Sequence, residues 1–95
     1  MDESLKPLSM LRQGESGTVM NLAGGTEFQS RVISMGIMVG CDVTVVKNGH
    51  KSGGPVLTAI GDSRIMIGHG MTDKIMIEVN WLKQSQLNSG LFYLK

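Results

Sequence analysis

The 95-residue sequence has few aromatic side chains, one cysteine, almost no net charge and no long apolar run, and each shortage excludes a class of protein. Aromatic residues make up 4% of the chain and the formal net charge is +1, so it lacks the basic surface and stacking rings with which small barrels bind nucleic acid. The single cysteine, Cys41, has no internal partner for a disulfide, which favours a reducing compartment. No apolar run approaches the roughly 18 residues that a membrane-spanning helix needs. We therefore expect a protein that binds no nucleic acid and does not insert into a membrane.

The amino-terminal residues and the glycine content narrow this expectation. Residues 1–8 are acidic and contain no apolar core of a secretion signal, which predicts a cytoplasmic protein. The length allows one small domain, and thirteen glycines imply tight turns and short strands rather than a helical bundle. We predict a small barrel domain over residues 1–79, followed by a distinct tail over residues 80–95.

The centre of the chain predicts a short helix. Thr26 is expected to cap its amino terminus, and Gln29, three residues later, can complete a capping box. Phe28, Val32 and Met35 then fall at i, i+4 and i+7, which places them on one apolar stripe of about three turns. These residues are predicted to have structural roles.

The same stretch predicts how the helix ends. Gly36 stands where a left-handed residue closes a helix, and Ile37 is placed to fold back in a Schellman-type contact. Residues 38–41 follow as a type II turn, with Gly40 at the position that needs a positive φ. Beyond the turn, residues 42–47 alternate as a strand.

Apolar alternation predicts the remaining strands, with Thr18, Met20 and Leu22 on one face of the first strand and Val19 on the other. Their residues are 17–22, 56–60, 64–67 and 75–79. Gly61, Asp62 and Ser63 separate the second and third of these segments and predict a compact hairpin. The predicted fold class is therefore mainly β: a partly open barrel of five to six short strands, with the helix inserted between the first and second strands.

Three short segments complete the prediction. Residues 1–6 are expected to be frayed. Residues 7–11 form a helical turn or an extended plug that buries Leu8 and Leu11. Residues 68–73 are too rich in glycine to predict a helix.

The order of these segments resembles the FeoA family, small cytosolic partners of the bacterial ferrous iron transporter FeoB. The matching series includes RVISMGI at residues 31–37, glycine at 40, GPV at 54–56, RIMI at 64–67 and IMIEV at 75–79. The resemblance implies an SH3-like barrel that acts as an adaptor, binding and regulating the cytosolic GTPase portion of FeoB. Two positions depart from the family pattern: Val39 replaces a common proline, and residues 68–70 replace the start of a short helix.

Residues suited to catalysis or metal binding are scattered. Residues 51–55 contain lysine, serine and glycine in an order that does not fit a phosphate-binding P-loop, so any nucleotide hydrolysis would belong to the partner. Cys41, His50 and His69 occur singly, without the spacing that places two metal ligands on one face. We therefore predict no catalytic residues, no cofactor and no metal site.

A protein-binding surface is the remaining functional prediction. The eight methionines either fill the core or form an adaptable docking surface. Ile37, Met38 and Val39 form an apolar triplet in a turn that is hard to bury whole, which predicts a partner-binding site. Met35 is expected to act as an anchor beside the triplet. Arg31 either steers an acidic partner or is simply solvated.

The tail supports an alternative function. Trp81, Phe92 and Tyr93 are three of the four aromatic residues of the chain. The tail could pack on the barrel, contact a partner or a second copy, or be disordered. If Trp81 and Phe92 form a self-complementary patch, the protein would be a homodimeric, metal-responsive regulatory module instead.

Overall fold

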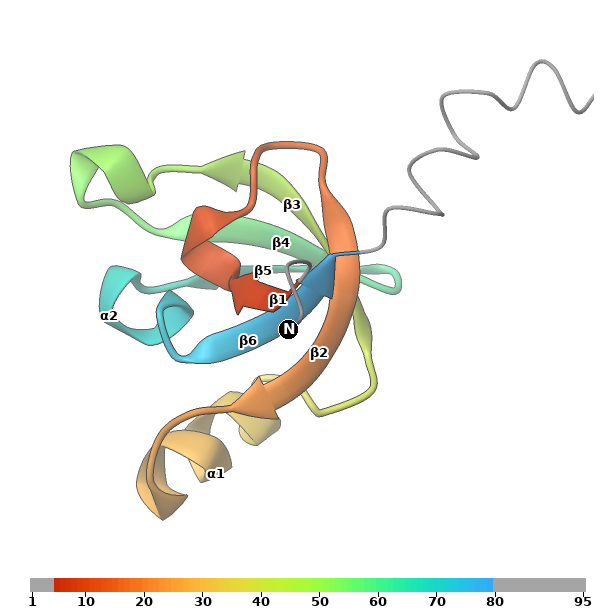
Figure 1. Ribbon diagram of the computed structural model, residues 1–95, viewed down its shortest axis with the longest axis vertical. Coiled ribbons are helices and arrows are strands. Elements are labelled where there is room, and N and C mark those ends of the chain that lie inside the picture. Colours follow the sequence, from red (N-terminus) through yellow and green to blue (C-terminus); the bar gives the residue numbers. More distant parts are fainter. Residues whose placement is uncertain (1–4, 80–95) are drawn as a thin grey trace, which may run out of the picture.

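The computed structural model describes residues 5–79, which form one antiparallel sheet of six strands curled around a hydrophobic core (Figure 1). The strands are β1 (Leu5–Pro7), β2 (Ser16–Leu22), β3 (Asp42–Asn48), β4 (Val56–Ile60), β5 (Ser63–Ile67) and β6 (Ile75–Val79). They are hydrogen-bonded in the order β1-β6-β2-β3-β4-β5. The connections carry the helices α1 (Thr26–Ser34) and α2 (His69–Thr72) and the 3₁₀ turns η1 (Leu8–Met10) and η2 (His50–Ser52). The predicted mainly β fold with an inserted helix is confirmed.

Strand β1 is the element that the sequence pattern does not predict. It is only three residues long and contains Lys6 and Pro7, which are both poor strand formers. In the structure Leu5 lies opposite Glu78 of β6, so the expectation that residues 1–6 are frayed is wrong for Leu5 and Lys6. As an edge strand, β1 tolerates the missing N–H of Pro7. Because of this extra strand, α1 follows the second strand rather than the first.

A β-bulge in β2 moves Leu22 to the same face of the strand as Val19. Val19 pairs with Ile77 and Leu22 with Ile75, so three steps along β2 match two steps along β6. The extra residue lets Val19 and Leu22 both point into the core, while Met20 is exposed. The prediction that Leu22 shares a face with Met20 and opposes Val19 is therefore wrong.

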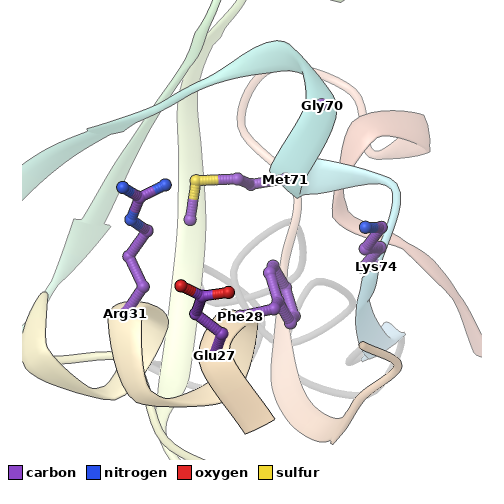
Figure 2. Close-up of a pocket in the computed structure, with 6 residues that line it drawn as sticks. All are labelled: Glu27, Phe28, Arg31, Gly70, Met71 and Lys74. Atoms are coloured by element: carbon purple, nitrogen blue, oxygen red, sulfur yellow. The ribbon is translucent and has the colours of Figure 1, made fainter. Parts of the chain in front are cut away.

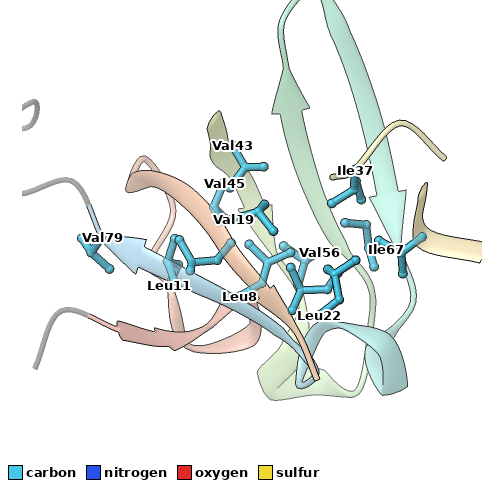
Figure 3. Close-up of a cluster of buried hydrophobic side chains, with 13 residues drawn as sticks. Leu8, Leu11, Val19, Leu22, Ile37, Val43, Val45, Val56, Ile67 and Val79 are labelled. Atoms are coloured by element: carbon cyan, nitrogen blue, oxygen red, sulfur yellow. The ribbon is translucent and has the colours of Figure 1, made fainter. Parts of the chain in front are cut away.

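The core is built from aliphatic side chains of strands β2 to β6, with contributions from η1, α1 and the segments that follow them (Figure 3). Among residues 5–79 its buried members are Leu8, Leu11, Val19, Leu22, Val32, Ile37, Val43, Val45, Val56, Ile67, Ile75, Ile77 and Val79. The predicted burial of Leu8 and Leu11 is confirmed. The even spacing of the buried residues in β3 and β6 also agrees with the predicted alternation.

Strands β4 and β5 form the predicted hairpin. Ile60 lies opposite Ser63, so the loop has only two residues, Gly61 and Asp62. Gly61 has a φ of +60°, which suits the first loop position of a type II′ turn. The hairpin is therefore confirmed, with Ser63 in the strand rather than in the loop.

Helix α2 forms a single turn within residues 68–73, for which the glycine content predicted no helix. The backbone N–H groups of Met71 and Thr72 donate to the Gly68 carbonyl oxygen at 3.0 and 3.3 Å. Thr72 is buried and Met71 packs against the core. Tertiary packing therefore overrides the weak helix propensity of glycine here.

Candidate functional site

Helix α1 begins one residue earlier than the sequence predicts. Gly25 occupies the N-cap position without a side-chain cap, and Thr26 is exposed within the first turn, so the predicted cap by Thr26 is wrong. The Gln29 side chain does reach back, but its Nε2 donates to the Gly24 carbonyl oxygen at 2.9 Å. A Cβ on Gly24 would lie 2.4 Å from the Phe28 ring, so this ring packs directly on the glycine backbone. The absence of a side chain at Gly24 therefore makes room for the Phe28 ring at the start of the helix.

The predicted apolar stripe of α1 is confirmed. Val32 is fully buried, and Phe28 and Met35 are partly buried against the core cluster. Arg31 is exposed. The helix is thus held by one face, and its other faces are free to contact another molecule.

The end of α1 is the predicted Schellman motif. The Gly36 N–H donates to the Ile33 carbonyl oxygen at 2.9 Å, and the Ile37 N–H donates to the Val32 carbonyl oxygen at 3.2 Å. Gly36 has a φ of +97°, which glycine adopts without strain. The motif folds the chain back so that Ile37 enters the core, where it is only 1% exposed.

The burial of Ile37 corrects the predicted docking surface. The triplet is not exposed as a unit: Ile37 belongs to the core, whereas Met38 is 53% and Val39 60% exposed. Folding back of the residue after the helix end is a normal part of the Schellman motif. Ile37 is therefore a structural residue and cannot anchor a partner.

The turn after Ile37 holds Met38 and Val39 in fixed positions. The Cys41 N–H donates to the Met38 carbonyl oxygen at 3.1 Å, and Gly40 has a φ of +99°, as the predicted type II turn requires. The turn is tied to β2, because the Gly40 N–H donates to the Val19 carbonyl oxygen at 2.7 Å and the Val19 N–H donates to the Cys41 carbonyl oxygen at 2.9 Å. The turn therefore forms with Val39 at the position where FeoA proteins commonly have proline.

A third exposed apolar side chain follows Val19, the residue of β2 to which the turn is hydrogen-bonded. Met20 follows Val19 at the bulge of β2 and is 47% exposed. We call Met20, Met38 and Val39 the turn patch. Sequence reasoning missed Met20, because the hydrogen bonds that join Val19 to the turn link segments that are distant in the chain.

A groove lies on another side of α1, between this helix and α2 (Figure 2). It has a volume of about 460 Å³ and is lined by Glu27, Phe28, Arg31, Gly70, Met71 and Lys74. The Lys74 Nζ lies 5.5 Å from the centre of the Phe28 ring, within the range of a cation–π interaction. We call this opening the helix groove. Arg31, predicted as a partner contact, lines it.

The structure also shows where potential metal ligands lie. Within residues 5–79, no three histidine, cysteine, aspartate or glutamate side chains come together as a metal site would need. Cys41 is half-buried at the end of the turn. The predictions for His50 and His69 concern side chains that the structure does not describe. None of the helices in the described range is long and apolar enough to cross a bilayer.

Comparison with known proteins decides the family. The FeoA domain matches residues 6–79, which include all of β2 to β6. The chain belongs to the FeoA domain family. One relative is a protein of Methanocaldococcus jannaschii that is named as an Fe(2+) transport protein A. It is 36% identical over 72 residues, which cover 76% of this chain and 84% of that protein. The resemblance inferred from the sequence is thereby confirmed.

Solved structures of FeoA proteins share the fold. One crystal structure, of an iron uptake regulatory protein (FeoA), is 30% identical with a TM-score of 0.72, covering 80% of this chain and 97% of that one. The solution structure of iron(II) transport protein A from Clostridium thermocellum is 26% identical with a TM-score of 0.70, covering 77% and 44%. A manganese-dependent transcriptional repressor matches over 42% of its length at 19% identity and a TM-score of 0.73, which shows the SH3-like fold alone.

Proposed function

We propose that this FeoA-domain protein is a non-catalytic cytoplasmic adaptor of ferrous iron uptake that binds and regulates the cytosolic GTPase portion of the transporter FeoB. The names of its FeoA relatives, an Fe(2+) transport protein and an iron uptake regulatory protein, support the link to iron uptake. The contact surface is α1 with the turn patch. An adaptor of this kind must share the compartment of the GTPase portion, which is why we place it in the cytoplasm.

The turn patch is the observation that carries the proposal. Its three side chains are apolar and about half exposed, although they sit on backbone that several hydrogen bonds hold in place. Burying one such side chain completely contributes about 1.5–3 kcal/mol. Because the backbone is already fixed, little conformational entropy is lost when a partner covers the patch. Exposed apolar side chains on a backbone that is held in place are typical of a docking site.

The other predicted contact residues have smaller parts in the proposal. Arg31 lies on α1 at the helix groove, where its charge would steer an acidic region of the partner. Met35 is half-buried against the core, so only part of its side chain can touch a partner. The tail over residues 80–95 lies outside the described residues, so packing on the barrel, contact with a partner or a second copy, and disorder all stay predictions for it.

Replacing both Met38 and Val39 by aspartate should weaken binding to the purified cytosolic portion of FeoB from the same organism by at least about tenfold. The reason is that two apolar contacts are lost and two charges must be desolvated at the interface. Isothermal titration calorimetry on the full-length chain, with the GTPase portion loaded with GDP or with a GTP analogue, measures the effect.

Met66→Asp is the matched control for this experiment. Met66 is 60% exposed, like Val39, but it lies on β5 rather than on the turn. The control variant should bind as the unaltered protein does. Equal affinity of the double variant and the unaltered chain, with both folded by circular dichroism, would remove the turn patch from the interface.

A further inference from the structure

A second groove lies far from α1, between the segment that follows η1 and the region of η2. In the orientation of Figure 1, η2 is at the top of the molecule and α1 at the bottom. The groove has a volume of about 440 Å³, and its walls include Met10, Arg12, Asn48 and Lys51. We call it the η groove. Neither the turn patch nor the helix groove shares a residue with it.

The walls of the η groove are held rigidly. The Asn48 side-chain amide donates to the Ser9 and Leu11 carbonyl oxygens at 3.1 and 2.7 Å, which ties the η1 segment to the end of β3. Leu11 is buried in the core, and Ser9 donates from its hydroxyl to the Asp73 carboxylate at 2.6 Å. The backbone that forms this side of the groove is therefore already ordered before a ligand binds.

The described residues that line the η groove carry positive charge only. Arg12 and Lys51 are exposed, come from different segments, and form no ion pair within residues 5–79. None of the described residues that line the groove is acidic. The nearest carboxylate along the chain, Glu15, accepts a hydrogen bond from the Arg12 backbone N–H at 2.7 Å and forms its ion pair, at 3.9 Å, with the Lys6 Nζ and not with the Arg12 guanidinium. The helix groove, by contrast, contains the carboxylate of Glu27.

An apolar side chain lies beside these two cations. Met10 is 59% exposed at the end of η1, and it is flexible enough to fit a range of partner side chains. Two cations are too few for a nucleic-acid surface, particularly in a chain of net charge +1. The combination of one adaptable apolar contact and two free cations fits an acidic peptide with a neighbouring apolar residue.

We propose that the η groove binds an acidic segment of a partner protein, with the carboxylate between Arg12 and Lys51 and an adjacent apolar side chain on Met10. The charge-assisted hydrogen bonds from the guanidinium and ammonium groups fix the acid. The contact with Met10 should make the groove bind such a peptide more tightly than a free anion of the same charge. This site does not depend on the interface proposed for FeoB, since it occupies another part of the surface.

An NMR titration of the full-length ¹⁵N-labelled chain tests the proposal. The probe is the peptide acetyl-Gly-Leu-Asp-Leu-Gly-amide, and the comparison peptide carries asparagine in place of aspartate. We expect saturable shifts of the amides of residues 10–13 and 51–52, with a dissociation constant at or below about 10 mM for so short a probe. The asparagine peptide should bind at least about fivefold more weakly, because it lacks the charge.

Variants of the two cations test the assignment of residues. Arg12→Gln and Lys51→Gln should each weaken binding by about threefold, the effect expected of one exposed charge. Arg64→Gln removes an exposed arginine on β5 and should leave binding unchanged. The amide spectra report directly whether each variant is folded.

Several results would overturn the proposal. These are the absence of saturable shifts up to about 10 mM peptide, shifts centred on the helix groove, or equal binding of the asparagine peptide. Binding of acetate as strong as that of the peptide would also overturn it, because acetate carries the same single charge and Met10 would then contribute nothing.

Discussion

Replacing Ile37 by alanine should lower the free energy of unfolding by about 2–5 kcal/mol, the range measured when a large aliphatic side chain is truncated in a packed core. Ile37 is 1% exposed and belongs to the cluster that fills the barrel. The Schellman motif holds its backbone through the bond from the Ile37 N–H to the Val32 carbonyl oxygen, so the site cannot collapse easily around the cavity. Urea unfolding followed by far-ultraviolet circular dichroism measures the loss.

The neighbouring Met38→Ala variant is the control for Ile37→Ala. Met38 is 53% exposed, so its truncation should change the free energy of unfolding by no more than about 0.5 kcal/mol. Similar losses for both variants would contradict the burial of Ile37. The two variants also separate folding from binding. Ile37→Ala changes the packing of the core, whereas Met38→Ala removes an exposed side chain of the turn patch.

Replacing Gly17 by alanine should lower the free energy of unfolding by about 3 kcal/mol, at the upper end of the usual cost of overpacking. Gly17 lies where β2 pairs with both β3 and β6. A Cβ there would lie 2.4 Å from the Ile77 Cγ2 and 2.5 Å from the Glu78 carbonyl oxygen. The side-chain atom could shift, but the carbonyl belongs to the strand, so the pairing of β2 with β6 would have to open. Thermal and urea unfolding by circular dichroism measure this effect.

Gly70→Ala is the control for Gly17→Ala, with an effect expected in the opposite direction. Gly70 lies in α2, has no positive φ, and a Cβ there would meet no atom within 4 Å. Alanine is the better helix former, so this variant should be as stable as the unaltered protein or more stable by up to about 1 kcal/mol. A Gly17→Ala variant as stable as Gly70→Ala would show that β2 and β6 can separate without cost.

Features set by a few neighbouring residues follow from the sequence. The Schellman end at Gly36, the turn at Gly40 and the hairpin loop at Gly61 each depend on one glycine with a positive φ and the residues next to it. The apolar stripe of α1 and the alternation in β3 and β6 likewise depend on spacing along one element. Two local features were predicted wrongly: the cap of α1, where Gly25 rather than Thr26 occupies the N-cap position, and the single turn of α2, which the glycine content argued against.

The candidate site depends on contacts between distant segments, and here sequence reasoning was incomplete. It predicted Met38 and Val39 as surface residues correctly, but it placed Ile37 with them because local pattern does not show which residue of an apolar triplet enters the core. It missed Met20, because the hydrogen bonds between Val19 of β2 and the turn link segments that are distant in the chain. The η groove likewise needs Arg12 and Lys51 to meet from separate segments.

By itself, then, the sequence determined the family, the barrel class and the helix–turn unit, because all three depend on short-range spacing and on the order of elements along the chain. Only the tertiary structure decided that residues 5–7 add a strand to the sheet, which face of β2 is buried, and which apolar side chains remain exposed. The physical reason is that pairing and burial are settled between segments far apart in the chain. A shift of one residue in register moves every later side chain of a strand to the opposite face.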